Sequence, residues 1–218
     1  AEIIKTENVT KRFGELVAVD RVNYVLRENE VAGIIGSNGA GKTTFFNLIT
    51  GYYPPDEGTI LYQGEDITRV SPEKRVDMGM MRTFQLTSTF DNLTVLNNLV
   101  LSFYRAHKSA SLFSLFFTTC KRYRGEERIA ESLETFELQN ESDRQVKHLS
   151  LGEKRRLEIA MALLPEPRVL LLDEPLAGLA ELEIKEVLGV LSKHIGKQTI
   201  LIVEHKISKV EDFVERLT

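Results

Sequence analysis

The chain carries, at residues 36–43, the stretch Gly36-Ser37-Asn38-Gly39-Ala40-Gly41-Lys42-Thr43. This stretch matches the phosphate-binding pattern G-x-x-x-x-G-K-[ST]. The apolar run at residues 31–35 before it is typical of a buried strand, and residues 44–50 after it form a helix-like segment that Gly51 closes. A strand, a glycine-rich loop and a helix in this order predict a phosphate site. The alternative is a glycine-rich turn that binds nothing.

The residue types in this loop suit the binding of a nucleotide. Glycines allow backbone N–H groups to converge on phosphate oxygens, and the helix N-terminus adds partial positive charge. We expect Lys42 to reach the β and γ phosphates and the Thr43 hydroxyl to ligate Mg²⁺. The predicted ATP-binding residues of this segment are Gly36, Ser37, Asn38, Gly39, Ala40, Gly41, Lys42, Thr43 and Thr44.

Composition limits the class of protein. The chain has 218 residues, of which 42% are hydrophobic and 28% charged, as in ordinary soluble globular domains. A net charge of -4 gives no electrostatic case for a nucleic-acid partner. Cys120 is the only cysteine, so no disulfide can form within the chain. No signal peptide is expected, and the apolar stretch at 112–117 is far shorter than the roughly 20 residues of a membrane span. At a membrane, another chain would have to hold the protein.

Strand-like and helix-like segments alternate along most of the chain. This alternation predicts an α/β fold with a mostly parallel sheet covered by helices on both faces, and the phosphate loop at 36–43 indicates the P-loop NTPase type. Residues 2–35 are β-rich and indicate an N-terminal antiparallel β subdomain, whereas residues 90–150 carry helical signals. We therefore predict a core at 1–89 and 151–218 and a helical subdomain at 90–150.

A second stretch supplies carboxylates. The apolar run at 169–172, typical of a central parallel strand, ends at Asp173-Glu174. Asp173 is expected to hold Mg²⁺ through water, and Glu174 to polarise the attacking water. The alternative is a polar turn that simply leaves the sheet.

Five further features, in position and order, resemble those of ATP-binding-cassette (ABC) ATPase subunits. Phe13 resembles the aromatic residue that stacks on adenine, and Gln85 resembles the glutamine that senses Mg²⁺ and the γ-phosphate. Residues 149–153, Leu-Ser-Leu-Gly-Glu, resemble the family signature, and residues 177–180 lie where the family has its dimer-contact loop. His205 resembles the histidine that contacts the γ-phosphate. The resemblance covers essentially the whole chain.

The resemblance implies a role for each matching residue. The implied catalytic residues are Glu174, His205 and Lys42, and the implied Mg²⁺ ligands are Thr43, Gln85 and Asp173. In this family two cassettes pack head to tail, which implies a homo- or heterodimer with a second ABC ATPase subunit. The resemblance also implies which residues contact the ATP held by that partner: Ser150, Leu151, Gly152 and Glu153.

Taken singly, these residues also have structural interpretations. A phenylalanine after a first strand is more often a core residue, a lone glutamine is usually solvated, and a lone histidine is more often structural. The signature stretch could be an ordinary helix N-terminus with a capping box, Ser150 as N-cap and Glu153 at N3. Because that geometry also binds anions, the two interpretations are compatible.

Several strings resemble the ATPase subunits of branched-chain amino-acid importers; they lie at residues 13–20, 47–51, 82–85, 155–160 and 203–205, with a long stretch at 102–128. This resemblance implies an ATPase that binds ATP and ADP and powers uptake of branched-chain or related amino acids. It implies transmembrane permease subunits as partners, no nucleic acid, and a place on the cytoplasmic face of the cell membrane. The alternatives are urea or short-amide import, lipopolysaccharide export, a binding-only cassette, or a cassette protein of translation or DNA repair.

Three departures from the family pattern stand out. Leu151 and Glu153 replace the commoner Gly and Gln of the signature, and Ala180 stands where Asp or Asn is common. Family members usually continue further beyond the histidine that His205 matches, so we expect a truncated C-terminal tail. Ser150 and Gly152 are kept, so activity is expected.

Overall fold

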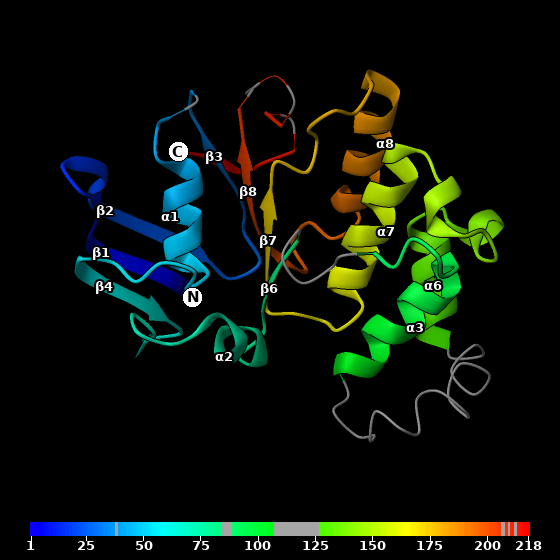
Figure 1. Cartoon of the computed structure of the whole chain (residues 1–218), viewed down its shortest axis with the longest axis horizontal. Coiled ribbons are helices and arrows are strands. Elements are labelled where there is room, and N and C mark those ends of the chain that lie inside the picture. Colours follow the sequence, from blue (N-terminus) through cyan, green and yellow to red (C-terminus); the bar gives the residue numbers. More distant parts are fainter. Residues whose placement is uncertain (38, 84–88, 107–126, 206–207, 209, 212) are drawn as a thin grey trace. The chain divides into compact units, whose positions relative to one another are not determined.

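The computed structural model (Figure 1) describes residues 1–37, 39–83, 89–106, 127–205, 208, 210–211 and 213–218. Its contacts divide the chain into two compact units. The first unit contains Ala1–Arg82, Arg168–Ala177 and His194–Thr218, and the second contains Thr83–Pro167 and Gly178–Lys193.

The first unit holds two sheets. A four-stranded antiparallel sheet has the order β2-β1-β4-β5, with β1 at Glu2–Phe13, β2 at Leu16–Arg27, β4 at Glu57–Tyr62 and β5 at Glu65–Asp66. A five-stranded parallel sheet has the order β6-β7-β8-β3-β9, with β6 at Met80–Arg82, β7 at Val169–Asp173, β8 at Thr199–Glu204, β3 at Val31–Ile35 and β9 at Arg216–Leu217. The expected α/β fold with an antiparallel N-terminal sheet is confirmed.

Helix α1, at Lys42–Ile49, lies between the two sheets (Figure 1). Its buried side chains join residues of both sheets in one apolar core; they include Phe45, Phe46, Leu48 and Ile49. Gly51 follows the helix with φ 81°, which confirms the expected left-handed position there. A side chain at this position would also collide with Arg75, because a Cβ would lie 2.7 Å from its Nε.

Arg75 is a buried cation whose guanidinium is bonded to backbone carbonyls. It belongs to helix α2, at Pro72–Asp77, and its side chain is 1% exposed. Its guanidinium donates to the backbone carbonyls of Leu48, Ile49, Ile67, Thr68 and Val70. The first two carbonyls end α1, so a positive charge faces the negative end of the helix dipole of the phosphate-loop helix.

The second unit is helical. Its helices are α3 at Val95–Ala106, α6 at Glu127–Thr135, α7 at Leu151–Leu163 and α8 at Glu181–Ser192, with 3₁₀ turns at Gln139–Glu141 and Val146–His148. Helix α3 packs on α6 and α7, and α7 packs on α8. The Thr94 hydroxyl accepts the N–H of Asn97, as expected of the N-cap of α3.

Helices α7 and α8 are grouped differently by their contacts and by the predicted domain boundaries. Their contacts place both helices in the helical unit, whereas residues 151–218 were predicted to belong to the core. The domain assignment of these helices stays a prediction. Helix α8 ends at Ser192, and Ile195 is exposed beyond it. No helix in the described parts of the chain is long and apolar enough to cross a membrane.

Candidate functional site

The glycine-rich loop joins β3 to α1 and depends on backbone conformations that suit glycine. Gly41 is the N-cap of α1 with φ 82°, and Gly39 has the same φ. A Cβ on Gly41 would lie 2.3 Å from the carbonyl oxygen of Ala18, so any other residue would displace the loop from β2. The helix therefore begins with its free N–H groups at the loop, as anion binding requires.

Lys42 folds back over this loop. Its side chain is 6% exposed, and Nζ donates to the carbonyl oxygens of Gly36 at 2.6 Å and Ser37 at 2.8 Å. The third neighbour of Nζ is Nδ1 of His205 at 3.2 Å. An ammonium group has three N–H donors, so these contacts use all of them. A bound phosphate would have to take over some of these positions.

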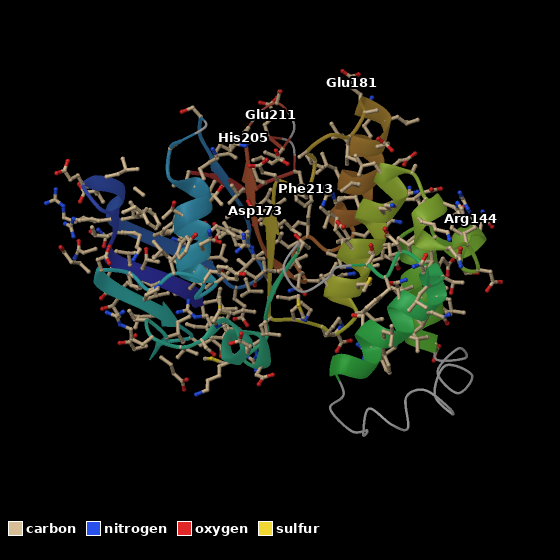
Figure 2. All side chains as sticks on the ribbon, in the orientation of Figure 1. Arg144, Asp173, Glu181, His205, Glu211 and Phe213 are labelled. Atoms are coloured by element: carbon tan, nitrogen blue, oxygen red, sulfur yellow. The ribbon has the colours of Figure 1, made fainter. Side chains whose placement is uncertain are left out.

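Glu174 and His205 meet where two neighbouring parallel strands end. Glu174 directly follows β7 and His205 directly follows β8; Figure 2 labels His205 there, with Asp173 at the end of β7. Nε2 of His205 lies 2.6 Å from Oε1 of Glu174. Because an ammonium cannot accept a hydrogen bond, Nδ1 must accept from Lys42, and Nε2 carries the proton donated to Glu174. The structure thus brings Lys42, His205 and Glu174 into one chain of contacts.

Asp173 is held by an arginine that the sequence analysis did not single out as functional. Nη2 of Arg82 donates to Oδ2 of Asp173 at 2.7 Å, and both side chains are largely buried. Nη1 of Arg82 also donates to Asn47 Oδ1 at 2.6 Å and to Thr50 Oγ1 at 3.3 Å, both on or next to α1. Arg82 therefore ties the end of β7 to the phosphate-loop helix. In the sequence, Arg82 was marked only by its place in the string at 82–85 that resembles the importer ATPases.

The metal ligands were predicted from hard oxygen donors. Thr43 is exposed in the first turn of α1, and Asp173 is largely buried at the end of β7. Within the described ranges, no group of three or more His, Cys, Asp or Glu side chains could hold a metal ion. A hydroxyl and one carboxylate fit Mg²⁺, which binds through few protein ligands and mainly through phosphates and water. Gln85, the third predicted ligand, lies outside the described residues, as does Asn38 of the loop.

Phe13 lies at the end of β1 and is 44% exposed. Its ring contacts the ring of Tyr53 edge-on, with centroids 5.5 Å apart. Nζ of Lys11 lies 5.7 Å from the centre of the same ring. The phenylalanine is thus a surface aromatic and not a core residue, and part of its ring remains open to a ligand.

The signature residues start helix α7 in the second unit. Ser150 is the N-cap: its hydroxyl accepts the N–H of Glu153 at 3.1 Å, while its own N–H donates to Oε2 of Glu153 at 2.7 Å. The expected capping box is therefore present, and Leu151 is exposed beside it. The N–H of Gly152 donates to Oε1 of Glu183 at 2.9 Å. Glu183 lies in the first turn of α8 and was not among the site residues predicted from the sequence.

Glu183 is a carboxylate held by two helix starts. Its other oxygen accepts the N–H of Ala180 at 3.0 Å. Hydrogen bonds from the backbone N–H groups of Ala180 and Gly152 lower the pKa of Glu183. A Cβ on Gly152 would lie 2.9 Å from Cγ of Glu183, so this glycine permits the close approach of α7 and α8.

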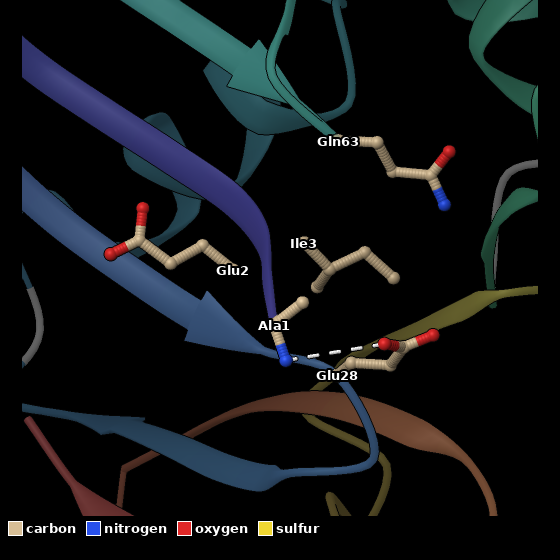
Figure 3. Close-up of a pocket in the computed structure, with 5 residues that line it drawn as sticks. All are labelled: Ala1, Glu2, Ile3, Glu28 and Gln63. Atoms are coloured by element: carbon tan, nitrogen blue, oxygen red, sulfur yellow. Dashed lines mark ion pairs between the residues drawn. The ribbon is translucent and has the colours of Figure 1, made fainter.

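A separate pocket of about 260 Å³ lies on the antiparallel sheet, lined by Ala1, Glu2, Ile3, Glu28 and Gln63 (Figure 3). One ion pair crosses it, between the amino group of Ala1 and Glu28 at 4.0 Å. None of its lining residues belongs to the phosphate loop or to the strand ends that carry Glu174 and His205. This pocket is therefore not the predicted nucleotide site.

Comparisons with known proteins agree in one family. The sequence profile of the ABC transporter family matches residues 19–177. The high-affinity branched-chain amino acid transport ATP-binding protein LivG of Escherichia coli (strain K12) is 37% identical, over 99% of this chain and 86% of LivG. The corresponding protein BraF of Pseudomonas aeruginosa is 37% identical, over 95% of this chain and 84% of BraF.

Solved structures show the same likeness. The ADP conformation of MJ1267, an ATP-binding cassette of an ABC transporter, superposes with a TM-score of 0.82 at 33% identity, covering 100% of this chain and 86% of that one. A dimeric post-hydrolysis state of the cassette MJ0796, bound to ADP and Pi, gives a TM-score of 0.79 at 26% identity, covering 99% and 93%. These similarities confirm the resemblance drawn from the sequence motifs.

Proposed function

The chain belongs to the ABC transporter family, and we propose that it is the ATP-binding and ATP-hydrolysing subunit of a membrane transporter for branched-chain or related amino acids. As an ABC ATPase it converts ATP and water to ADP and phosphate. The cargo is proposed from the names of the relatives LivG and BraF, which are branched-chain amino acid transport ATP-binding proteins.

The observation that carries the hydrolytic part is the chain of contacts from Lys42 through His205 to Glu174. Three side chains from separate segments converge beside the phosphate loop: a cation, an imidazole and a carboxylate. Their chemistry matches what phosphoryl transfer to water needs, namely charge neutralisation and an oriented nucleophile.

In this proposal each group has one task. Lys42 exchanges its loop carbonyls for oxygens of the β and γ phosphates. Glu174 accepts a hydrogen bond from the attacking water and orients it, while His205 holds Glu174 and faces the γ-phosphate. Phe13 stacks on the adenine ring, and the remaining loop residues wrap the phosphates.

Mg²⁺ is proposed as the metal that accompanies ATP. Thr43 would ligate it through its hydroxyl and Asp173 through water, with Gln85 as a further ligand. The ion would neutralise charge on the phosphates. Arg82 keeps Asp173 in place for this task, because their ion pair fixes the carboxylate at the end of β7.

The partner subunits follow from the family. ABC ATPases work with membrane permease subunits, and dimeric cassettes such as MJ0796 support dimerisation. We propose that Ser150, Leu151, Gly152 and Glu153 contact the ATP held by the second ATPase subunit, and that the permease subunits hold the protein on the cytoplasmic face of the cell membrane. Helix N-termini bind anions, which supports the first of these contacts.

The test is a Glu174→Gln variant assembled with its permease subunits in lipid vesicles. We expect phosphate release to fall about 10²–10⁴-fold while ATP binding is retained, because the amide cannot act as a base. Glu65→Gln, on the exposed strand β5, makes the same change in charge away from the loop and should release phosphate normally. Normal turnover in Glu174→Gln would remove this residue from the role. Failure of branched-chain amino acids to stimulate the unsubstituted complex would reject the proposed cargo.

A further inference from the structure

Glu204 is a buried carboxyl at the end of an otherwise apolar or uncharged strand. It is the last residue of β8, whose sequence is Thr-Ile-Leu-Ile-Val-Glu, and its side chain is 3% exposed. In the parallel ladder it pairs with Ile35, the last residue of β3 before the phosphate loop. A carboxyl group in such surroundings is unfavourable unless hydrogen bonds satisfy it. Its partners therefore indicate what it does.

Those partners are backbone N–H groups of the two segments that carry the proposed catalytic side chains. Oε1 of Glu204 accepts the N–H of Leu176 at 2.9 Å. Oε2 lies 3.3 Å from the N–H of His205, the next residue along the chain. One side chain thus fastens the turn after Glu174 and the residue that contacts Glu174.

The turn after β7 needs such a support because the strand ladder stops before it. The β7–β8 pairing ends at Asp173 and Val203, and the last backbone bond runs from the N–H of Glu174 to the carbonyl of Val203 at 2.9 Å. Beyond this bond, the side chain of Glu204 also connects the two segments, through the N–H of Leu176.

Glu174 itself has an uncommon backbone. Its φ is 49°, in the left-handed region that residues other than glycine seldom occupy. Such a conformation persists only where surrounding contacts hold it. The N–H of Ala177 donates back to the carbonyl of Glu174 at 3.1 Å, and the hydrogen bond from Leu176 to Glu204 anchors the same turn.

We propose that Glu204 is a positioning residue for ATP hydrolysis: by accepting the N–H groups of Leu176 and His205 it fixes Glu174 opposite His205. The inference rests on the proposed ATPase function. Glu204 touches neither nucleotide nor water in this role; it acts through Glu174 and His205. Loss of its bonds would let the turn relax, and displacements of about 1 Å can lower turnover about 10²-fold.

The experiment compares Glu204→Ala with Glu204→Gln in the full complex with permease subunits. Alanine removes both acceptors, so we expect kcat to fall about 10²-fold while the Kd for ATP stays unchanged. Glutamine keeps one oxygen for the N–H of Leu176 and should restore most of kcat. If Glu204→Ala does not fold, Glu204→Asp, whose carboxyl is one methylene too short to reach Leu176, takes its place.

Glu30 supplies a matched control for burial. It is 8% exposed, lies in the same unit, and accepts the backbone N–H of Arg27 at 2.7 Å, but it precedes β3 at the end away from the phosphate loop. Glu30→Ala should lower Tm and leave kcat per folded molecule unchanged. Equal losses of kcat in Glu30→Ala and Glu204→Ala, or no rescue by glutamine, would overturn the positioning role.

A second readout separates this inference from the ATPase proposal. The amide hydrogen of Leu176 should exchange with solvent faster in Glu204→Ala than in the unsubstituted protein, and slowly again in Glu204→Gln. If the unsubstituted complex hydrolyses no ATP, the proposed function fails whatever the exchange shows. If it hydrolyses ATP and the exchange of Leu176 does not respond to Glu204, only the positioning role fails.

Discussion

Nδ1 of His205 lies 3.2 Å from Nζ of Lys42, which places the histidine after β8 against the lysine of the loop after β3. The two residues are 163 positions apart in the chain. Since Lys42 has only donors, the contact fixes the histidine proton on Nε2, where it bonds Glu174 at 2.6 Å. The lysine and the carboxylate are thus joined through one imidazole ring.

Replacing this histidine should separate binding from turnover. His205→Ala leaves the phosphate loop and the three N–H donors of Lys42 in place, so ATP affinity should be retained. Glu174 loses its hydrogen-bond donor, and kcat should fall about 10²–10⁴-fold. Single-turnover phosphate release and nucleotide titration measure the two quantities separately. An equal loss of affinity and turnover would show that His205 serves binding instead.

The ion pair between Arg82 and Asp173 should dominate local stability. Arg82→Met leaves the largely buried Asp173 carboxylate without its partner, which costs about 3–5 kcal/mol in such pairs. Adding Asp173→Asn removes the uncompensated charge and should recover part of the loss. Urea unfolding of the two single variants and the double variant measures the coupling. Additive effects would contradict a direct interaction.

Arg75 should matter for folding and not for chemistry. Burial lowers its pKa to about 10, so it stays charged at neutral pH. Arg75→Met strips the buried carbonyls of Leu48 and Ile49 of their donors and should cost about 3 kcal/mol or more of unfolding free energy. The exposed Arg69→Met is the control and should leave the urea midpoint unchanged. An unchanged unfolding free energy in Arg75→Met would show that other donors replace the guanidinium.

Gly152 lies directly against the side chain of Glu183. A Cβ at residue 152 would lie 2.9 Å from Oε1 and Cγ of Glu183, so Gly152→Ala must push this carboxylate off the N–H that it accepts. We expect Gly152→Ala to lower Tm in the unsubstituted background. In a Glu183→Ala background the added methyl meets no carboxylate, and its effect on Tm should be smaller. Thermal unfolding by circular dichroism checks both; equal effects in the two backgrounds would contradict the contact.

The pair between Glu30 and Arg216 should make stability depend on pH. Burial raises the pKa of Glu30, but hydrogen bonds from Arg216 and from the N–H of Arg27 outweigh it, so the net pKa lies below the ordinary value of 4.5. A carboxyl whose pKa is lowered by folding stabilises the folded state at pH values above its pKa in the unfolded chain. This contribution is lost as the pH falls through its pKa in the folded protein.

The corresponding test is Glu30→Gln. It should lower the unfolding free energy by about 1–3 kcal/mol at pH 7, and its difference from the unsubstituted protein should shrink below pH 4.5. Urea titrations at several pH values measure this difference. A difference that stays constant from neutral to acidic pH would exclude the charge of Glu30 as its source.

The features whose causes are local could be predicted from the amino-acid sequence. Eight consecutive residues, 36–43, contain the glycines, lysine and threonine of a phosphate loop, and the apolar runs on either side specify a buried strand and a helix. The capping box of Ser150 and Glu153 and the left-handed Gly51 depend on neighbours within one helical turn, so they too could be predicted. Phe13 could be selected by resemblance, but its exposure could not.

Which distant polar groups form hydrogen bonds with one another could not be predicted, because it depends on how the strands pack. Arg82 and Asp173 are 91 positions apart, and Glu30 and Arg216 are 186 apart. In the sequence, Glu204 is simply the polar residue that ends a predicted strand. In the structure, its carboxyl accepts a hydrogen bond from Leu176, in the turn after a neighbouring strand. Sequence periodicity reports which face of an element is buried, whereas a buried charge takes whichever donors the packed strands bring within hydrogen-bond distance. That choice is made by the parallel sheet, which aligns the ends of β3, β7 and β8.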